Sequence, residues 1–283
     1  ARIGTGEAPR TAAVFAKAFA SDRAGRVHAA HQALFAAMAD VPGMRLPRPL
    51  GWLAGARLVL LGEVPGRPVA PDLEAGDLDL AARLARAIDG LHRSGAALER
   101  RHGPADEWAI LARRVEGLDR SLPRLADRAE RSLARLARVW PAEADWRWRP
   151  IHRDLHPAQL LRDGGAIGLV DLDDAAMGEP ALDVANLAGH LVWAAIERHG
   201  AVGAEAAAEA FRRAHRALDP AADPRALLAL EAGTLLRLVT IHGPRVGTDV
   251  AVDGLRACEE RLAALEAGNQ VQIHRGARMR SPR

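Results

Sequence analysis

Residues 151–187 read IHRDLHPAQLLRDGGAIGLVDLDDAAMGEPALDVANL, and this stretch decides how the rest of the chain is interpreted. An HRD triplet at 152–154 ends in Asp154, and the amide side chain of Gln159 follows five residues later. A second acid, Asp171, directly follows the apolar run 167–170, which is typical of a short buried strand. The stretch therefore offers a carboxylate and an amide at the two ends of one loop, and a second carboxylate at the end of a strand.

This arrangement suits the transfer of a phosphoryl group from a nucleoside triphosphate. Such a reaction needs a carboxylate that orients the attacking hydroxyl and accepts its proton, and oxygen ligands that hold Mg²⁺ against the phosphates. We therefore predict that Asp154 is the catalytic residue and that Gln159 and Asp171 are the metal ligands. The alternative is a surface turn followed by a strand cap, which would explain the HRD triplet alone but explains all three features together poorly.

The stretch resembles the aminoglycoside phosphotransferase and choline kinase family of small-molecule kinases. The resemblance is carried by HRDLHPAQLL, LVDLDDA and GEPALDVANL, where the family reads roughly HGDLHPGN, IDWEDA and GDPxxDLA. It implies an α+β, two-lobed, protein-kinase-like fold, with a small N-terminal β lobe, a larger and mainly helical C-terminal lobe, and ATP with Mg²⁺ between them. It also implies that Asp183 helps to brace the catalytic loop. A protein kinase is disfavoured, because GEP follows Asp171 too soon to leave room for an activation segment.

Lys17 is the only lysine in the chain, although lysine and arginine together number 39. Arginine does not replace a compact ammonium group equivalently, so a retained lysine favours a role such as the kinase lysine that contacts the ATP phosphates. A lysine that survived by chance is the alternative. The helix predicted over 23–39 lacks the glutamate that pairs with this lysine in kinases. We therefore expect Lys17 to pair with another carboxylate, with Asp171 as the candidate, or ATP to be held differently.

The chain is predicted to divide into a nucleotide-binding lobe at 1–62, a hinge at 63–66 and a helical lobe at 67–268. The hinge sequence LLGEVPG at 60–66 is similar to the family's LLMEYLPG, whose backbone pairs with adenine, which implies that the Gly62 carbonyl and the Val64 N–H bind the nucleotide. The motif GTG at 4–6 could end a glycine-rich loop. Apolar periodicity predicts helices over 77–94, 107–139 with a break near 122–123, 182–199, 204–217, 225–242 and 250–267, and composition predicts a disordered tail over 269–283.

Composition limits the partners. A net charge of +3 is small for 283 residues, the single cysteine excludes an internal disulfide, and no apolar run approaches 18 residues. We therefore expect a cytoplasmic protein that binds neither membrane nor nucleic acid, and the oligomeric state stays open. The acceptor would be a small molecule with a hydroxyl group, resembling an aminoglycoside, a sugar or an amino alcohol. A glutamine at this position, Gln159, resembles the maltokinase-like sugar kinases, which slightly favours a sugar as the acceptor. Acids that would suit a cationic acceptor are scattered over the last helices and favour no acceptor: Glu197, Glu205, Glu209, Glu231, Asp249 and Asp253.

Two other functions remain open from the sequence. A nucleotide-binding pseudokinase or regulatory module would explain the missing helix glutamate and the weak glycine-rich loop, whereas the presence of both Asp154 and Asp171 opposes it. An unrelated helical binding protein would require the whole of residues 151–187 to match a kinase by coincidence.

Overall fold

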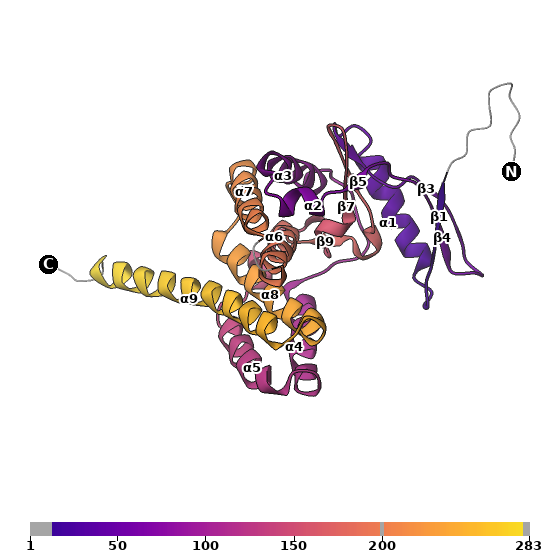
Figure 1. Cartoon of the computed structure of the whole chain (residues 1–283). Coiled ribbons are helices and arrows are strands. Elements are labelled where there is room, and N and C mark those ends of the chain that lie inside the picture. Colours follow the sequence, from indigo (N-terminus) through magenta and orange to yellow (C-terminus); the bar gives the residue numbers. More distant parts are fainter. Residues whose placement is uncertain (1–12, 199–200, 280–283) are drawn as a thin grey trace, which may run out of the picture.

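The computed structural model describes residues 13–198 and 201–279, with side chains up to residue 268. The chain forms a small lobe rich in strands and a larger lobe that is mainly helical, and the long last helix projects from the helical lobe (Figure 1). This mixed α+β architecture is the fold predicted from residues 151–187.

The small lobe is a three-stranded antiparallel sheet covered by one helix. Its strands β1 (Val14–Ala18), β3 (Pro49–Leu53) and β4 (Leu58–Gly62) lie in the order β1-β4-β3. Helix α1 (Ala24–Ala37) packs against β3 and β4, where alternate β4 residues Val59 and Leu61 are buried. Lys17 pairs in register with Val59, which places it one residue before the end of the edge strand.

The chain between the two lobes lies against a second sheet. Strand β2 (Met44–Arg45) pairs parallel with β8 (Ala166–Leu169), β8 pairs with β7 (Leu160–Asp163), and β5 (Arg67–Pro68) pairs with β7. Gly66 has φ +136°, and a Cβ there would lie 2.9 Å from the Arg162 carbonyl, so a side chain would collide with β7. The predicted hinge therefore rests on the hairpin that leads into Asp171.

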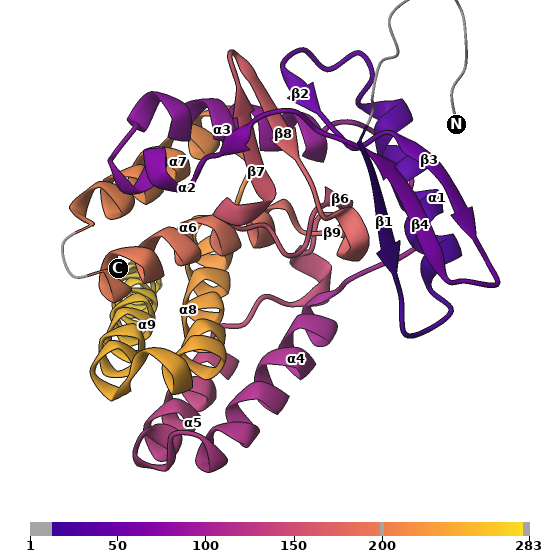
Figure 2. The ribbon, with the colours of Figure 1, turned by 45° about the vertical axis from the view of Figure 1, so that its right-hand side comes forward.

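The helical lobe is built around two buried helices. Helices α6 (Pro180–Glu197) and α8 (Pro224–Val246) pack against each other, α3 (Leu78–His92) and α7 (Val202–Leu218) cover one side, and α4 (Pro104–Glu116), α5 (Pro123–Ala137) and α9 (Thr248–Met279) cover the other (Figure 2). The remaining short elements are α2 (Ala70–Glu74), β6 (Arg149–Ile151), β9 (Ala176–Gly178) and the 3₁₀ turns η1 (Gly117–Arg120), η2 (Glu143–Asp145), η3 (Pro157–Gln159) and η4 (Leu172–Asp174). Of the described helices, α8 alone is long and apolar enough to cross a membrane, but 72% of its apolar window is buried inside the protein.

The predicted helices are present with small shifts at their ends. The break expected near 122–123 is η1, after which Pro123 starts α5 at a position where its missing N–H costs nothing. Asp77 caps α3 by accepting a hydrogen bond from the Leu80 N–H at 2.9 Å. The predicted tail differs, because the backbone of residues 269–279 continues α9. The motif GTG at 4–6 lies outside the described residues.

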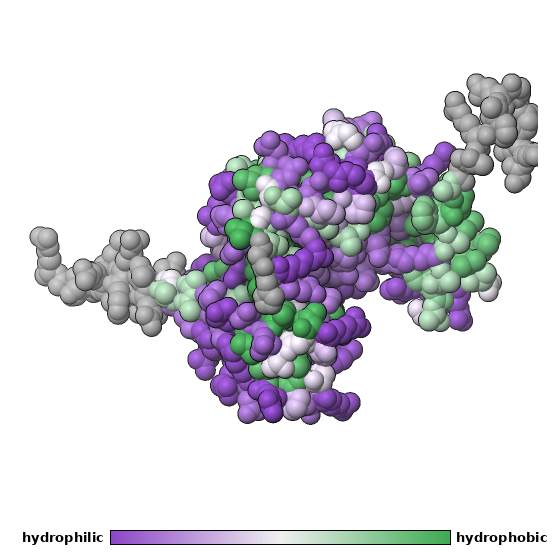
Figure 3. All heavy atoms as spheres, in the orientation of Figure 1, coloured by the Kyte–Doolittle hydropathy of each residue, from purple (hydrophilic) through white to green (hydrophobic). Residues whose placement is uncertain are grey.

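The surface of the two lobes differs in polarity. Apolar side chains are exposed on the strands of the small lobe, whereas polar side chains dominate the visible face of the helical lobe (Figure 3). The large exposed apolar side chains on these strands are Val14, Phe15, Leu50, Trp52 and Leu53, and Phe35 is exposed on α1.

The packing of α3 against α7 generates a prediction about pH. Burial, together with the nearby His92, lowers the pKa of His215 to about 4, from about 6.5 in an unfolded chain. The unfolded chain then binds a proton that the folded protein does not, so this stability is full above pH 6.5 and is lost as the pH falls toward 4. We expect the free energy of unfolding to fall by up to about 3 kcal/mol through this group.

The measurement is the urea midpoint between pH 7 and 4 for the natural protein and for His215→Gln. The variant should show a shallower dependence on pH across this window. An equal slope in both proteins would show that His215 does not titrate as its burial requires.

Candidate active site

The loop after β6 is held in a strained shape by the first turns of α6. Arg153 has φ 75°, in the left-handed region that costs a residue with a side chain of order 1–3 kcal/mol. The fully buried Asp183 accepts the backbone N–H groups of His152 at 2.8 Å and of Arg153 at 2.7 Å, and its carboxylate lies 3.0 Å from His92 Nε2. Asn186 Nδ2 donates to the Arg153 carbonyl at 2.6 Å. These bonds fix the direction in which the next residue, Asp154, leaves the loop.

The four side chains predicted to carry the chemistry line one cavity. Lys17, Asp154, Gln159 and Asp171 border a space of about 230 Å³ at the junction of the lobes, together with Arg23, Asp173 and Asp174. The side chain of Asp154 is 39% exposed and that of Asp171 is 46% exposed, so both carboxylates can meet a ligand. Gln159 ends η3, and its Oε1 accepts the backbone N–H of His156 at 3.3 Å.

Asp171 also has an unusual backbone. Its φ of 62° and ψ of 52° place it in the left-handed region, at the point where β8 ends and η4 begins. Strained residues of this kind occur most often at functional sites, where the surrounding structure has to hold them. The turn brings Asp171 and the next acids, Asp173 and Asp174, to the same cavity.

Lys17 is bound by two carboxylates from the other lobe. Its Nζ lies 2.5 Å from Asp171 Oδ1 and 2.6 Å from Asp173 Oδ2. Burial alone would lower the pKa of Lys17, but the hydrogen bonds to both carboxylates outweigh it and raise the pKa. The ion pair with Asp171 that the sequence suggested is present, and Asp173 supplies a second partner.

Asp173 also connects this pair to helix α1. The Nε2 of the fully buried His31 lies 3.9 Å from Asp173 Oδ1, and the Asp173 side chain is only 8% exposed. Burial by itself would raise the pKa of Asp173, but His31 and Lys17 outweigh it and lower the pKa. In the absence of the helix glutamate, Asp173 thus supplies the second carboxylate on Lys17, and His31 lies against it at a distance longer than a hydrogen bond.

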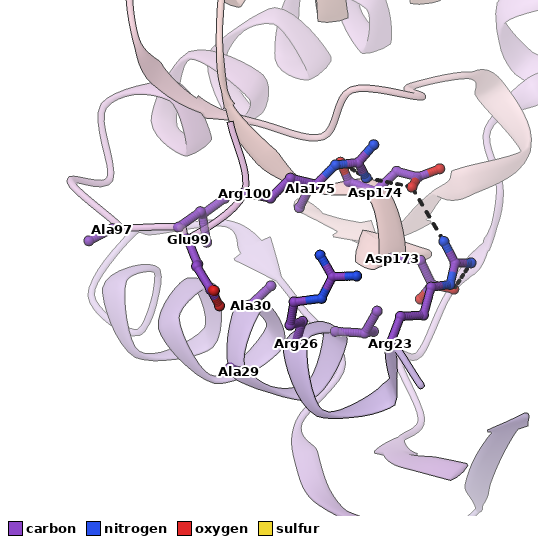
Figure 4. A pocket seen from close by; sticks show the side chains of 12 residues that line it. Arg23, Arg26, Ala29, Ala30, Ala97, Glu99, Arg100, Asp173, Asp174 and Ala175 are labelled. Carbon is purple, nitrogen blue, oxygen red and sulfur yellow. Dashed lines mark hydrogen bonds and ion pairs between the residues drawn. The ribbon is translucent and has the colours of Figure 1, made fainter. Parts of the chain in front are cut away.

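Asp174 joins three separate segments by ion pairs. Its carboxylate lies 2.6 Å from Arg100 Nη1, 3.6 Å from Arg23 Nη1 and 3.6 Å from Arg153 Nη1. Figure 4 shows Arg23 and Arg100 pointing toward Asp174 from opposite sides of a second cavity of about 480 Å³. Asp174 therefore ties the start of α1 to the catalytic loop and to the segment that precedes α4.

The predicted adenine-binding groups, Gly62 and Val64, do not line the cavity that Lys17 and Asp154 border. Gly62 ends β4 and its N–H donates to the Arg48 carbonyl at 2.8 Å. Val64 is buried against the hairpin, where a Cβ on Gly168 would lie 2.6 Å from Val64 Cγ1. Val64 also borders a separate hollow of about 310 Å³ beside the end of α1.

Comparison with known proteins identifies the family of the chain. A family model described as the phosphotransferase enzyme family matches residues 2–230. The chain belongs to this phosphotransferase family. No curated protein sequence matches the chain.

Several solved kinase structures have the same fold as this chain. A choline/ethanolamine kinase family protein from Mesorhizobium loti is 18% identical with a TM-score of 0.59, and the match covers 90% of this chain and 81% of that one. A choline kinase from Streptococcus pneumoniae is 12% identical with a TM-score of 0.60, covering 93% and 92%. A glucosamine kinase is 22% identical with a TM-score of 0.55, covering 82% and 68%. At these identities the likeness shows the fold alone.

Two arginines at the site were not found from the sequence. Arg23 borders the cavity of Lys17 and Asp154. Arg237, in the middle of α8, places Nη1 3.4 Å from Asp154 Oδ1, and its side chain is only 8% exposed. It lies 83 positions after Asp154 in a helix that is otherwise apolar at this point. An arginine inside an apolar helical run indicates that it has a buried partner. The sequence of the run does not show which carboxylate is that partner.

The hydrogen bonds of Asp183 generate a prediction about stability. Asp183→Asn removes the charge that strengthens three buried hydrogen bonds and sets an N–H group against a backbone N–H, so we expect a loss of about 3 kcal/mol. The measurement is the free energy of unfolding in urea. Asp127→Asn, on the exposed face of α5, is the control and should change it by no more than about 0.5 kcal/mol. Equal effects in the two variants would show that Asp183 does not hold the loop.

Proposed function

We propose that the protein transfers the γ-phosphoryl group of ATP to a hydroxyl group of a small molecule. The observation that carries the proposal is the convergence of Asp154, Gln159, Asp171 and Lys17 on one cavity between the lobes. Membership of the phosphotransferase family supports the reaction class. Asp154 and Asp171 come from different loops, and their joint exposure to one small space suits a site that holds an alcohol and a metal–nucleotide together.

In this proposal Asp154 orients the acceptor hydroxyl and accepts its proton. Its carboxylate is partly exposed, while its backbone is fixed through the loop that Asp183 and Asn186 hold. A positioned base of this kind contributes roughly 10²- to 10⁴-fold to the rate of proton transfer.

The oxygen atoms at the site fit Mg²⁺. Asp171 and Gln159 offer a carboxylate and an amide oxygen, and Mg²⁺ is commonly held by one or two protein carboxylates with substrate phosphates and water completing the shell. Within the described residues no group of three His, Cys, Asp or Glu side chains forms a metal site by itself, which agrees with a metal that is shared with the nucleotide. When bound, the ion would balance charge on the transferred phosphoryl group.

The remaining groups would hold the nucleotide. Lys17 would contact the phosphates, and the Gly62 carbonyl and Val64 N–H would pair with adenine at the end of β4. A glucosamine kinase of similar fold was solved with ADP and an aminoglycoside 2′-phosphotransferase with GDP, which supports a nucleotide in this place. A cytoplasmic location, where ATP is abundant, suits this activity.

The first test concerns Asp154. Asp154→Asn keeps the size of the side chain and removes the base, so we expect phosphoryl transfer to fall by roughly 10²-fold or more while ATP binding is kept. The measurement uses γ-labelled ATP with a panel of aminoglycosides, sugars, amino alcohols and nucleosides, and Asp127→Asn serves as the control. Undiminished transfer by Asp154→Asn would remove the catalytic role. ATP binding without transfer by the natural protein would instead support a pseudokinase.

The second test concerns Lys17. Lys17→Met leaves Asp171 and Asp173 close together without the cation that balances them, so Mg²⁺ should bind there more readily than in the natural protein. We expect Mg²⁺ alone to raise the melting temperature of the variant more than that of the natural protein, while phosphoryl transfer falls at least tenfold. An equal effect of Mg²⁺ on both proteins would show that Asp171 does not belong to a metal site.

A further inference from the structure

We propose that Arg237 sets the charge of the acceptor, and that the acceptor is an uncharged hydroxyl compound and not an amine-bearing cation. The inference rests on the proposed phosphotransferase function, because it concerns the molecule whose hydroxyl group meets Asp154. It is carried by three observations: the fixed guanidinium of Arg237, the histidines around it, and the pairing of nearby acids.

The guanidinium of Arg237 is held rigidly beside the catalytic carboxylate. Its Nη1 lies 3.4 Å from Asp154 Oδ1, and its Nη2 donates to Asn186 Oδ1 at 2.8 Å. Asn186 is itself fixed by the Arg153 carbonyl and accepts the hydroxyl of Thr234 at 3.0 Å. Arg237 is 6% exposed, and a guanidinium keeps its charge in proteins, so a permanent cation is buried within 3.4 Å of the carboxylate that the acceptor hydroxyl must approach.

The histidines around Arg237 do not add to its positive charge. The His156 and His190 rings lie 5.1 Å apart, and His242 lies against Trp193 with ring centroids 5.7 Å apart. Burial first and the Arg237 charge second lower the pKa of His190 well below its ordinary value, and burial is also the main reason why the pKa of His242 is lowered. These rings are therefore neutral near pH 7, and neutral rings suit the hydroxyl and C–H groups of a polyol.

The acids that might receive an ammonium group already face cations. Glu107 lies 2.8 Å from His102 Nε2 and 3.5 Å from Arg153 Nη2. Burial alone would raise the pKa of Glu107, but His102, Arg237 and Arg153 outweigh it and lower the pKa to about 2.

Glu231, on α8, is similarly occupied. Glu231 is buried between Arg212, at 3.0 Å, and Arg261, at 2.9 Å. Glu197 is exposed at the end of α6, and its effect on His242 is opposed by the charge of Arg245. Glu107 and Glu231 are therefore already matched by cations, and neither offers a free charge to an ammonium group.

The test compares acceptors that differ only in charge. Glucose and glucosamine form one pair, and glycerol and 3-amino-1,2-propanediol form a second. We expect kcat/KM with Mg²⁺ and ATP to favour the neutral member about tenfold or more, as like charges a few ångströms apart would require. Arg237→Gln should reduce this ratio to about threefold or less. Arg237→Lys should retain it, since it keeps the charge, and Arg213→Gln, on the exposed face of α7, is the matched control.

A second measurement separates this inference from the proposed function. The pKa values of His190 and His242, followed by NMR, should rise in Arg237→Gln and stay unchanged in Arg213→Gln, whether or not any acceptor is phosphorylated. Faster transfer to the amines by the natural protein, an unchanged ratio in Arg237→Gln, or unchanged histidine pKa values would each overturn the role of Arg237. If no acceptor is phosphorylated at all, the proposed function fails, and the histidine pKa values alone decide whether Arg237 sets the charge around Asp154.

Discussion

The ion pair that joins Lys17 to Asp171 and Asp173 is the contact on which the site depends. Lys17 lies on the edge strand of the small lobe, and both acids follow the hairpin of the other lobe. The ammonium group is compact enough to lie within 2.6 Å of both carboxylates. The pair acts together with other contacts between the two parts of the chain, which include α1 against η4, β2 against β8, and Leu34 of α1 in the large core.

Around this contact, the protein balances charge by distributing arginines among its acids. Asp174 is shared by three arginines, Glu107 is shared by Arg153 and His102, and Asp154 is approached by Arg237. Buried ion pairs add little net stability, because removing the charges from water costs about as much as their attraction returns. Their effect here is geometric, since each pair joins segments that are far apart in the chain. The ion pairs hold the strained loop around Arg153 in place, and they leave the carboxylates of Asp154 and Asp171 partly exposed to the cavity.

The site could be predicted from the sequence only where its members are close in the chain. Asp154, Gln159 and Asp171 lie within one short stretch, and the loop and hairpin between them leave few ways to arrange their side chains. Lys17 was found by a different signal, its rarity in an arginine-rich chain. The second carboxylate on Lys17 could not be chosen, because Asp173 and Asp174 are neighbours and only the turn η4 decides which of them faces the lysine.

The sequence by itself determined the kinase-like two-lobed fold, the identity of the acids at the site, and the helices of the large lobe, because apolar periodicity and local motifs are properties of neighbouring residues. Only the tertiary structure decided that Asp173 supplies the second carboxylate on Lys17, and that Arg237 stands beside Asp154. These contacts join residues from separate elements, and the packing of α1 on the small sheet and of α8 on α6 brings them together. The positive charge beside Asp154 is a consequence of that packing, and no local pattern in the chain records it.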